Sequence, residues 1–148
     1  GLGKTVQIAA FISGLNLTEP NKLFLILCPA TIIEQVLRSI LKWSVELKKW
    51  CNNCKIMLFH STICENEIST KSKIEKMENG IVVSSYGMFL VNNKFFRFRK
   101  KNFDYLILDE GHKIRNVDAK ITKSVKKIKT SHRLILSGAP VQNNLKEL

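Results

Sequence analysis

The chain begins with the stretch GLGKT, whose residue types and spacing suit the binding of a phosphate group. Glycines let a backbone turn tightly, so that its amide N–H groups can point at phosphate oxygens. A following lysine can reach the β- and γ-phosphates of a nucleotide, and a threonine hydroxyl can bind Mg²⁺. Candidate ATP-binding residues are therefore Gly1, Gly3, Lys4 and Thr5, with Thr5 also a candidate Mg²⁺ ligand.

This stretch is the second half of the pattern G-x-x-x-x-G-K-[ST], whose first position would precede Gly1. We therefore expect the phosphate loop to be truncated at its front. The alternative is a Gly-Lys-Thr sequence that occurs in a loop by chance.

Asp109 and Glu110 form a second candidate site, because these adjacent carboxylates directly follow the apolar run YLIL. Carboxylates at the edge of a core destabilise the fold unless a cation pairs with them, because burying a charge costs free energy. Asp109 can hold a Mg²⁺ shell, and Glu110 can orient and deprotonate an attacking water. A solvated turn after a strand is the alternative. Together with Lys4, the acid pair predicts nucleotide hydrolysis with these three residues as the catalytic group.

The elements that must position these residues alternate along the chain. Short apolar runs predict strands at 23–27, 55–59, 81–85, 105–109 and 133–138, and the segments between them are mostly helical, at 5–15, 32–50, 67–78 and 120–129. Such alternation predicts an α/β fold, with a mostly parallel sheet and helices on both faces. Ligands of such sheets bind at the carboxyl ends of the strands, where Asp109 and Glu110 would lie.

Length and composition limit the remaining choices. With 148 residues, 45% of them hydrophobic, the chain can form one domain with a sizeable core. Its net charge of +12 favours a polyanion such as DNA or RNA, although general over-use of lysine would give the same charge.

No membrane helix or signal peptide is evident, so no membrane partner is expected. Four cysteines without a secretory signal indicate a reducing compartment.

Five stretches of the sequence resemble motifs of one family. LDEGHKIRN and LILSGAPVQNNLKEL resemble motifs II and III of the SNF2 branch of superfamily 2 helicase-like ATPases. GLGKTVQ, LFLILCPATII and IVVSSYGMF resemble motifs I, Ia and Ib, and all five occur in family order. The spelling of the acid box is most similar to the Cockayne syndrome group B type and its yeast Rad26-type counterpart. The Rad54 and Mot1 types are near alternatives.

The resemblance implies that residues 1–148 are a RecA-like P-loop NTPase lobe, truncated at both ends, with the second lobe absent. It implies a DNA-dependent ATPase that uses ATP and Mg²⁺ to move along double-stranded DNA in the nucleus. The biological role would be transcription-coupled DNA repair or chromatin remodelling, with RNA polymerase II or nucleosomes as partners of the full-length protein. Because arginine fingers would come from the second lobe in cis, the isolated chain is expected to be nearly inactive.

The resemblance also implies roles for residues around the nucleotide site. His112 would couple that site to motif III, where Ser137, Gly138 and Gln142 would relay the state of the γ-phosphate. An ordinary surface histidine is the alternative for His112.

A further set of residues falls where family members contact the DNA backbone: Pro29, Thr31, Ser84 and Ser85. Short hydroxyl side chains and backbone amides at strand ends suit contacts with phosphates that read no bases.

Two other function classes stay open. One is a non-catalytic nucleotide- or DNA-binding module, against which the intact Lys4, Asp109 and Glu110 argue. The other is a P-loop enzyme of another kind, such as a kinase or GTPase, which the stretch SGAPVQNNL disfavours.

Two further patterns have simpler explanations. Cys51, Cys54, His60 and Cys64 are spaced much like a zinc knuckle, but the expected strand at 55–59 would hold its two ends apart. We therefore expect free thiols and no zinc. The basic aromatic stretch 94–102 is expected to be a surface connector, although it also suits single-strand binding.

The lysines of 120–129 lie largely outside an expected apolar face formed by Ile121, Val125 and Ile128. They would form either a solvated surface or a DNA contact.

Overall fold

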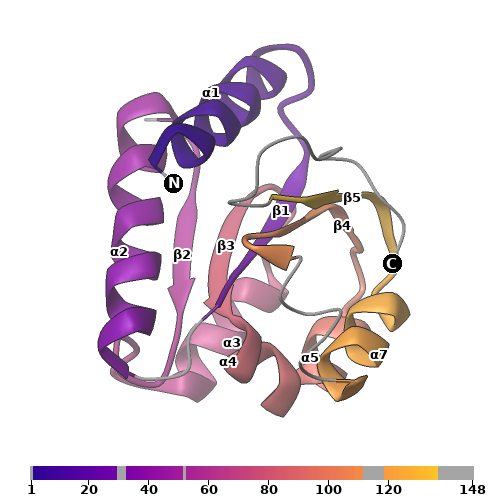
Figure 1. The fold of residues 1–148 in the computed structure, drawn as a ribbon. Coiled ribbons are helices and arrows are strands. Elements are labelled where there is room, and N and C mark those ends of the chain that lie inside the picture. The colour runs from indigo at the N-terminus through magenta and orange to yellow at the C-terminus, as the bar shows by residue number, and fades with distance from the viewer. Residues whose placement is uncertain (1, 30–32, 52, 112–118, 137–148) are drawn as a thin grey trace.

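The computed structural model describes residues 2–29, 33–51, 53–111 and 119–136, which form a sheet with helices on both faces (Figure 1). Its strands are β1 (Leu23–Cys28), β2 (Ile56–Phe59), β3 (Gly80–Ser85), β4 (Phe103–Leu108) and β5 (Thr130–Ile135). Its helices are α1 (Leu2–Thr18), α2 (Ile33–Trp50), α3 (Glu67–Glu75), α4 (Tyr86–Val91), α5 (Asn93–Arg97) and α7 (Ala119–Lys127). None of the helices in these ranges is long and apolar enough to cross a membrane.

The five strands pair in the order β2-β3-β1-β4-β5, and all four pairings are parallel. β1 lies at the centre, where Leu27 pairs with Ser84 on one side and with Leu108 on the other. Parallel neighbours need crossover connections, and the helical segments between the strands supply them. The predicted α/β fold with a mostly parallel sheet is therefore confirmed.

The central strand is buried on both faces, as its continuous apolar sequence predicts. On one face, Phe24 and Ile26 pack with α1 and α2, including the inward side chain of Trp43. On the other face, Leu25 and Leu27 pack with α3, α4, α5 and α7. The sheet thus separates two apolar layers, and each face of its carboxyl edge is bordered by different helices.

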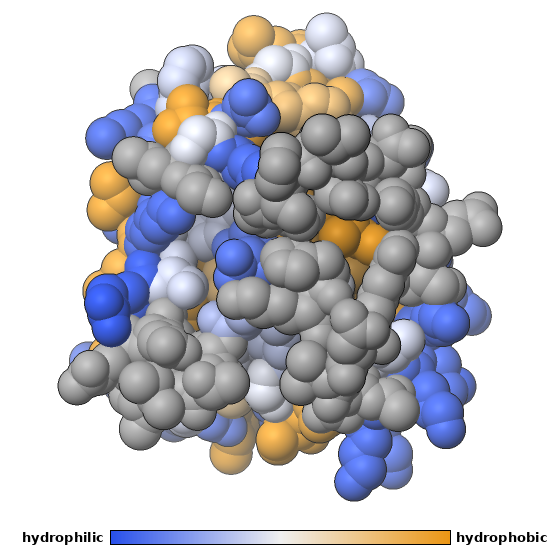
Figure 2. Space-filling model, viewed as in Figure 1, coloured by the Kyte–Doolittle hydropathy of each residue, from blue (hydrophilic) through white to orange (hydrophobic). Residues whose placement is uncertain are grey.

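The outer face of α7 is basic. Val125 is fully buried, whereas Lys123, Lys126 and Lys127 are exposed, as is Lys129 just after the helix. Figure 2 shows hydrophilic side chains gathered over α7, at the lower right of the view. The amphipathic pattern predicted for this segment is confirmed, and contact of its exposed lysines with DNA stays a prediction.

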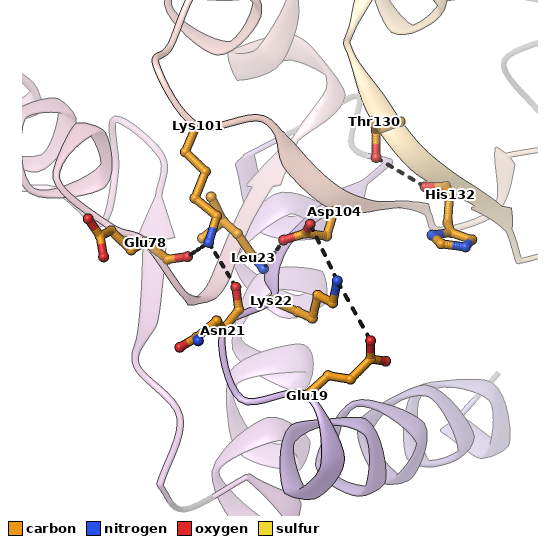
Figure 3. A network of polar contacts seen from close by, with 9 residues as sticks. All are labelled: Glu19, Asn21, Lys22, Leu23, Glu78, Lys101, Asp104, Thr130 and His132. Atoms are coloured by element: carbon orange, nitrogen blue, oxygen red, sulfur yellow. Dashed lines mark hydrogen bonds and ion pairs between the residues drawn. The ribbon is translucent and has the colours of Figure 1, made fainter.

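A polar network closes the amino-terminal edge of the sheet (Figure 3). The carboxylate Oδ2 of Asp104 accepts a hydrogen bond of 2.7 Å from the backbone N–H of Leu23. The ammonium of Lys101 donates to the carbonyl of Asn21 at 2.8 Å and to the carbonyl of Glu78. These bonds join the segments that precede β1, β3 and β4. This edge is therefore held together by its own polar groups, and it lies opposite the edge where the acid pair follows β4.

The connection after β3 differs from the expected surface connector, because it contains the two short helices α4 and α5. Phe96 of α5 is buried, and its ring centroid lies 5.5 Å from that of Phe89 and 6.2 Å from that of Phe103. Aromatic rings of the basic stretch 94–102 therefore contribute to the core. Helices of five or six residues have too few turns to give a readable apolar period, so the sequence does not reveal them.

Candidate functional site

Three strands end at the same level along the carboxyl edge of the sheet. Cys28 pairs with Ser85, and Leu27 pairs with Leu108, so Asp109 follows β4 at the level of Cys28. This register brings together three stretches singled out in the sequence: Pro29 after β1, Ser84 and Ser85 at the end of β3, and the acid pair after β4.

Asp109 is fixed by three separate elements. Trp43 of α2 donates a hydrogen bond of 3.0 Å from its indole Nε1 to the carboxylate Oδ2. The backbone N–H of Asp109 donates to the carbonyl of Leu27 at 2.9 Å, and its carbonyl accepts from the hydroxyl of Tyr86 at 2.8 Å. Because Trp43 packs in the layer of α1 and α2, the Asp109 carboxylate lies on that face of the sheet.

The surroundings of Asp109 disfavour its negative charge when no cation is present. Burial raises the pKa of the carboxyl group; the Trp43 hydrogen bond lowers that pKa, and the charge of Glu110 raises it. Burial also raises the pKa values of the Tyr86 hydroxyl and the Cys28 thiol, and the charge of Asp109 raises both further. These groups share a site of low polarity, where a positive ion would stabilise the ionised carboxylate.

Glu110 has a φ of 50°, in the left-handed region that residues with side chains rarely adopt. Such a conformation costs on the order of 1–3 kcal/mol and persists only where the surrounding structure imposes it. Strain of this kind is frequent at functional sites, so it agrees with the catalytic role predicted for Glu110.

Close packing at position 111 explains why a glycine follows the acid pair. A Cβ at this position would lie 2.6 Å from Cγ2 of Ile135 and 3.2 Å from Cβ of Leu108. The Gly111 N–H donates to the carbonyl of Leu136 at 3.0 Å. The close approach therefore ties the acid pair to the end of β5, from which the chain continues into Ser137.

The candidate phosphate-binding residues Gly3, Lys4 and Thr5 lie inside α1. The sequence predicts a helix from Thr5, but the helix begins at Leu2 and includes Gly3 and Lys4. Thr5 is 3% exposed, whereas no atom lies within 4 Å of a Cβ added at Gly3. Packing therefore does not require glycine at position 3, and its close approach to a phosphate stays a prediction.

The hydroxyls predicted to contact DNA are used within the protein. Ser84 is fully buried, and its Oγ donates to the carbonyl of Phe59 at 2.6 Å. Ser85 caps α4 by accepting a hydrogen bond of 3.1 Å from the backbone N–H of Met88. DNA contact through these hydroxyls stays a prediction. Ser84 would have to give up its bond to Phe59, whereas the Ser85 oxygen accepts its bond, so its O–H could still donate to a phosphate. The half-buried Pro29 does not face this restriction.

Several predicted site residues lie outside the described residues. They are Gly1 of the phosphate loop, Thr31 of the DNA-contact set, and the coupling residues His112, Ser137, Gly138 and Gln142.

The residues spaced like a zinc knuckle have other partners. The Cys51 thiol donates to the carbonyl of Ala9 at 3.5 Å, and burial raises its pKa to about 12. His60 Nδ1 lies 2.8 Å from Thr62 Oγ1, and the strand expected between the two ends is present as β2. In the part of the chain that the structure describes, no three His, Cys, Asp or Glu side chains are grouped to hold a metal.

Sequence reasoning did not single out Tyr86, Gly111 or Trp43 as site residues, although Trp43 belongs to an apolar stripe along the helix expected at 32–50. One signal was available for the two aromatic residues. An indole N–H or a phenol hydroxyl on a buried face needs a hydrogen-bond partner, so each predicts a polar group nearby.

Comparison with known proteins decides the family of the chain. A family model described as the SNF2-related domain matches residues 1–148. The chain belongs to the SNF2-related domain family. The predicted resemblance is thus confirmed over the whole chain.

Relatives of this SNF2-related domain include repair proteins. DNA excision repair protein ERCC-6 of Homo sapiens is 37% identical over 166 residues, which cover 100% of this chain and 10% of that protein. DNA repair and recombination protein RAD26 of Saccharomyces cerevisiae is 32% identical over 197 residues, covering 100% of this chain and 17% of that protein. The SNF2-related domain therefore spans only a small part of the curated relatives it matches.

A solved structure shares the fold. The Sulfolobus solfataricus SWI2/SNF2 ATPase core in complex with dsDNA matches with a TM-score of 0.70 and 29% sequence identity. The match covers 95% of this chain and 26% of that chain. The predicted RecA-like fold is confirmed by this similarity together with the parallel sheet.

Proposed function

We propose that this SNF2-related domain is the first ATPase lobe of an enzyme that hydrolyses ATP with Mg²⁺ and moves along double-stranded DNA. The observation that carries the proposal is the anchoring of Asp109 by Trp43 at 3.0 Å. This bond holds the Asp109 carboxylate on the face of the sheet that α1 covers, and α1 contains the candidate phosphate-binding residues Lys4 and Thr5.

The path of α1 supports a shared site. Residues 19–22 connect the end of α1 to the start of β1 at the amino edge, so the helix extends from there toward the carboxyl edge. A helix of 17 residues is about 25 Å long, and a strand of six residues is about 20 Å long. The helix α1 is therefore long enough for its first turn to reach the edge that carries Asp109.

The residues at this edge fit a Mg²⁺-bound triphosphate. Mg²⁺ prefers oxygen ligands, and the Trp43 bond lies on Oδ2, so Oδ1 of Asp109 can accept a cation. When bound, the ion would neutralise the charge that develops on the phosphates. Thr5 and Asp109 would hold it, Lys4 would bind phosphate oxygens, and Glu110 would orient the water and take its proton.

The proposed biological role rests on the relatives. The archaeal neighbour is described in complex with dsDNA, and the human and yeast relatives are named as DNA repair proteins. We infer a nuclear role in transcription-coupled repair or chromatin remodelling, with RNA polymerase II or nucleosomes as partners of the intact protein. Rad54-type and Mot1-type translocases are the nearest alternatives. A second lobe in cis would supply arginine fingers, so this domain alone would be nearly inactive.

ATP turnover by the intact protein, with and without duplex DNA, tests the proposal. Lys4→Ala should reduce the DNA-stimulated rate by at least about 100-fold, because it removes a positive charge directed at the transferred phosphate. The control Lys22→Ala, at the opposite edge of the sheet, should keep the wild-type rate. A wild-type protein that binds nucleotide without hydrolysing it would instead indicate a non-catalytic binding module.

A further inference from the structure

Trp43 links the metal-binding acid to a segment predicted to contact DNA. It belongs to α2, which begins at Ile33, soon after Pro29 in the chain, and its Nε1 donates to Oδ2 of Asp109. The ring is 1% exposed, and an indole has a single donor. If the carboxylate turned away, this buried donor would be left without its partner, at a cost comparable to that of breaking a hydrogen bond to a charged group.

Tyr86 makes a second link from another such segment. It is the first residue of α4 and directly follows Ser84 and Ser85. Its hydroxyl donates at 2.8 Å to the carbonyl of Asp109, and the side chain is 6% exposed. That carbonyl belongs to the peptide group between Asp109 and Glu110. Because a peptide group is planar, the orientation of this group fixes how the backbone enters Glu110, whose φ is 50°.

We propose that Trp43 and Tyr86 are positioning residues: Trp43 orients the Asp109 carboxylate, Tyr86 orients the peptide that carries Glu110, and each ties the site to one segment predicted to contact DNA. The proposal rests on the function proposed above for the acid pair. Contact of Pro29 with DNA would act on the carboxylate through α2. Movement of residues 84–85 would reach the peptide through Tyr86.

The two bonds act on different parts of the reaction. Trp43 controls a carboxylate oxygen, so its removal should weaken the Mg²⁺-dependent part of nucleotide binding. Tyr86 controls the peptide before Glu110, so its removal should slow turnover while nucleotide binding is kept. Groups that orient a metal ligand typically change metal affinity or activity by about 10-fold to 100-fold when they are removed.

The test uses the intact protein with Trp43→Phe and Tyr86→Phe. The matched controls are Trp50→Phe, which changes a half-exposed indole of the same helix, and Tyr105→Phe, which changes the other tyrosine. Equilibrium binding of a fluorescent ATP analogue is measured in Mg²⁺ and in EDTA, and ATP turnover is measured with and without duplex DNA.

Trp43→Phe should bind the analogue about tenfold more weakly in Mg²⁺ and equally well in EDTA. Tyr86→Phe should bind it within about twofold of wild type in both conditions and show a DNA-stimulated rate about tenfold lower. Both controls should resemble wild type. Equally weakened binding in Mg²⁺ and EDTA would indicate a general structural defect and overturn the positioning role, as would wild-type behaviour of both variants. Absence of Mg²⁺-dependent binding or turnover in the wild-type protein would instead refute the proposed function itself.

Discussion

Gly111 lies so close to Ile135 that a Cβ at position 111 would fall 2.6 Å from the Ile135 Cγ2 atom. The contact fastens the turn after β4 to the end of β5, and the bond from the Gly111 N–H to Leu136 reinforces it. β5 leads directly to Ser137 and Gly138, the predicted relay residues. The turn that carries the acid pair is thus joined to the end of β5 by a packing contact that admits no side chain at position 111.

Gly111→Ala should therefore damage both stability and turnover. Forcing a methyl group into this contact should cost about 1–3 kcal/mol of unfolding free energy and displace Glu110. Gly14→Ala is a matched control, because no atom lies within 4 Å of a Cβ added at Gly14 of α1, and alanine favours a helix by about 0.5–1 kcal/mol. Urea unfolding and ATP turnover of the intact protein check both. Equal stability of the two variants would contradict the close packing at Gly111.

Arg99 should be one of the strongest stabilising side chains of the domain. It is 6% exposed and donates to the carbonyls of Lys101 at 2.6 Å, Ile74 at 2.8 Å and Met77 at 3.1 Å. Its guanidinium also lies 5.0 Å from the ring centroid of Phe103. These contacts join the end of α3 to the start of β4.

Arg99→Lys should destabilise the fold by about 3 kcal/mol, because a single ammonium cannot reproduce the fork of donors. The neighbouring Arg97→Lys should have an effect below about 0.5 kcal/mol, since Arg97 is only half-buried and stacks on the exposed Phe98. Denaturant unfolding followed by circular dichroism measures the difference. Similar midpoints for the two variants would show that the buried bonds contribute little.

The exposed lysines of α7 test whether the basic surface binds nucleic acid. Changing Lys123, Lys126, Lys127 and Lys129 to Glu should weaken duplex binding and reduce the salt slope by about 0.9 for each DNA phosphate that these lysines neutralise. The control changes the same number of exposed lysines elsewhere, at positions Lys48, Lys55, Lys73 and Lys76. If both sets alter the binding isotherms equally at several salt concentrations, α7 acts only through net charge.

His60 should make stability depend on pH below neutrality. Burial lowers its pKa from the ordinary value of 6.5, so the unfolded chain takes up the proton first as the pH falls. Unfolding free energy should therefore decrease as the pH drops below about 6.5 and level off below the folded pKa. His60→Asn should flatten this part of the profile in unfolding measured from pH 5 to 8. An unchanged slope would show that His60 titrates equally in both states.

The sequence predicts much of the framework because the framework depends on local pattern. The apolar run at 23–27 suits a strand buried on both faces, and the apolar stripe of 32–50, which includes Trp43, identifies the inward face of α2. Contacts between distant residues are not predicted in this way. Trp43 and Asp109 are 66 positions apart, and their bond depends on how α2 packs beside the end of β4.

Ser84 and Ser85 show that residue types alone do not reveal hydrogen-bond partners. Their hydroxyls at the end of a strand suggest phosphate contacts, yet the bond to Phe59 and the cap of α4 already use them. Those two partners depend on β2 lying beside β3 and on a short helix that has no visible period. The serine residues thus correctly indicated the end of a strand, but the packing of β2 and α4 determined which groups their hydroxyls bond.

The most direct test of the account is ATP turnover by the intact protein with duplex DNA, comparing wild type with Glu110→Gln. The exchange keeps the size of the side chain and removes the base, so the rate should fall by at least about 100-fold while nucleotide affinity stays within a few-fold. Glu75→Gln, an exposed residue of α3, should behave as wild type. DNA-stimulated turnover of Glu110→Gln at close to the wild-type rate would contradict the claim that this acid pair hydrolyses ATP.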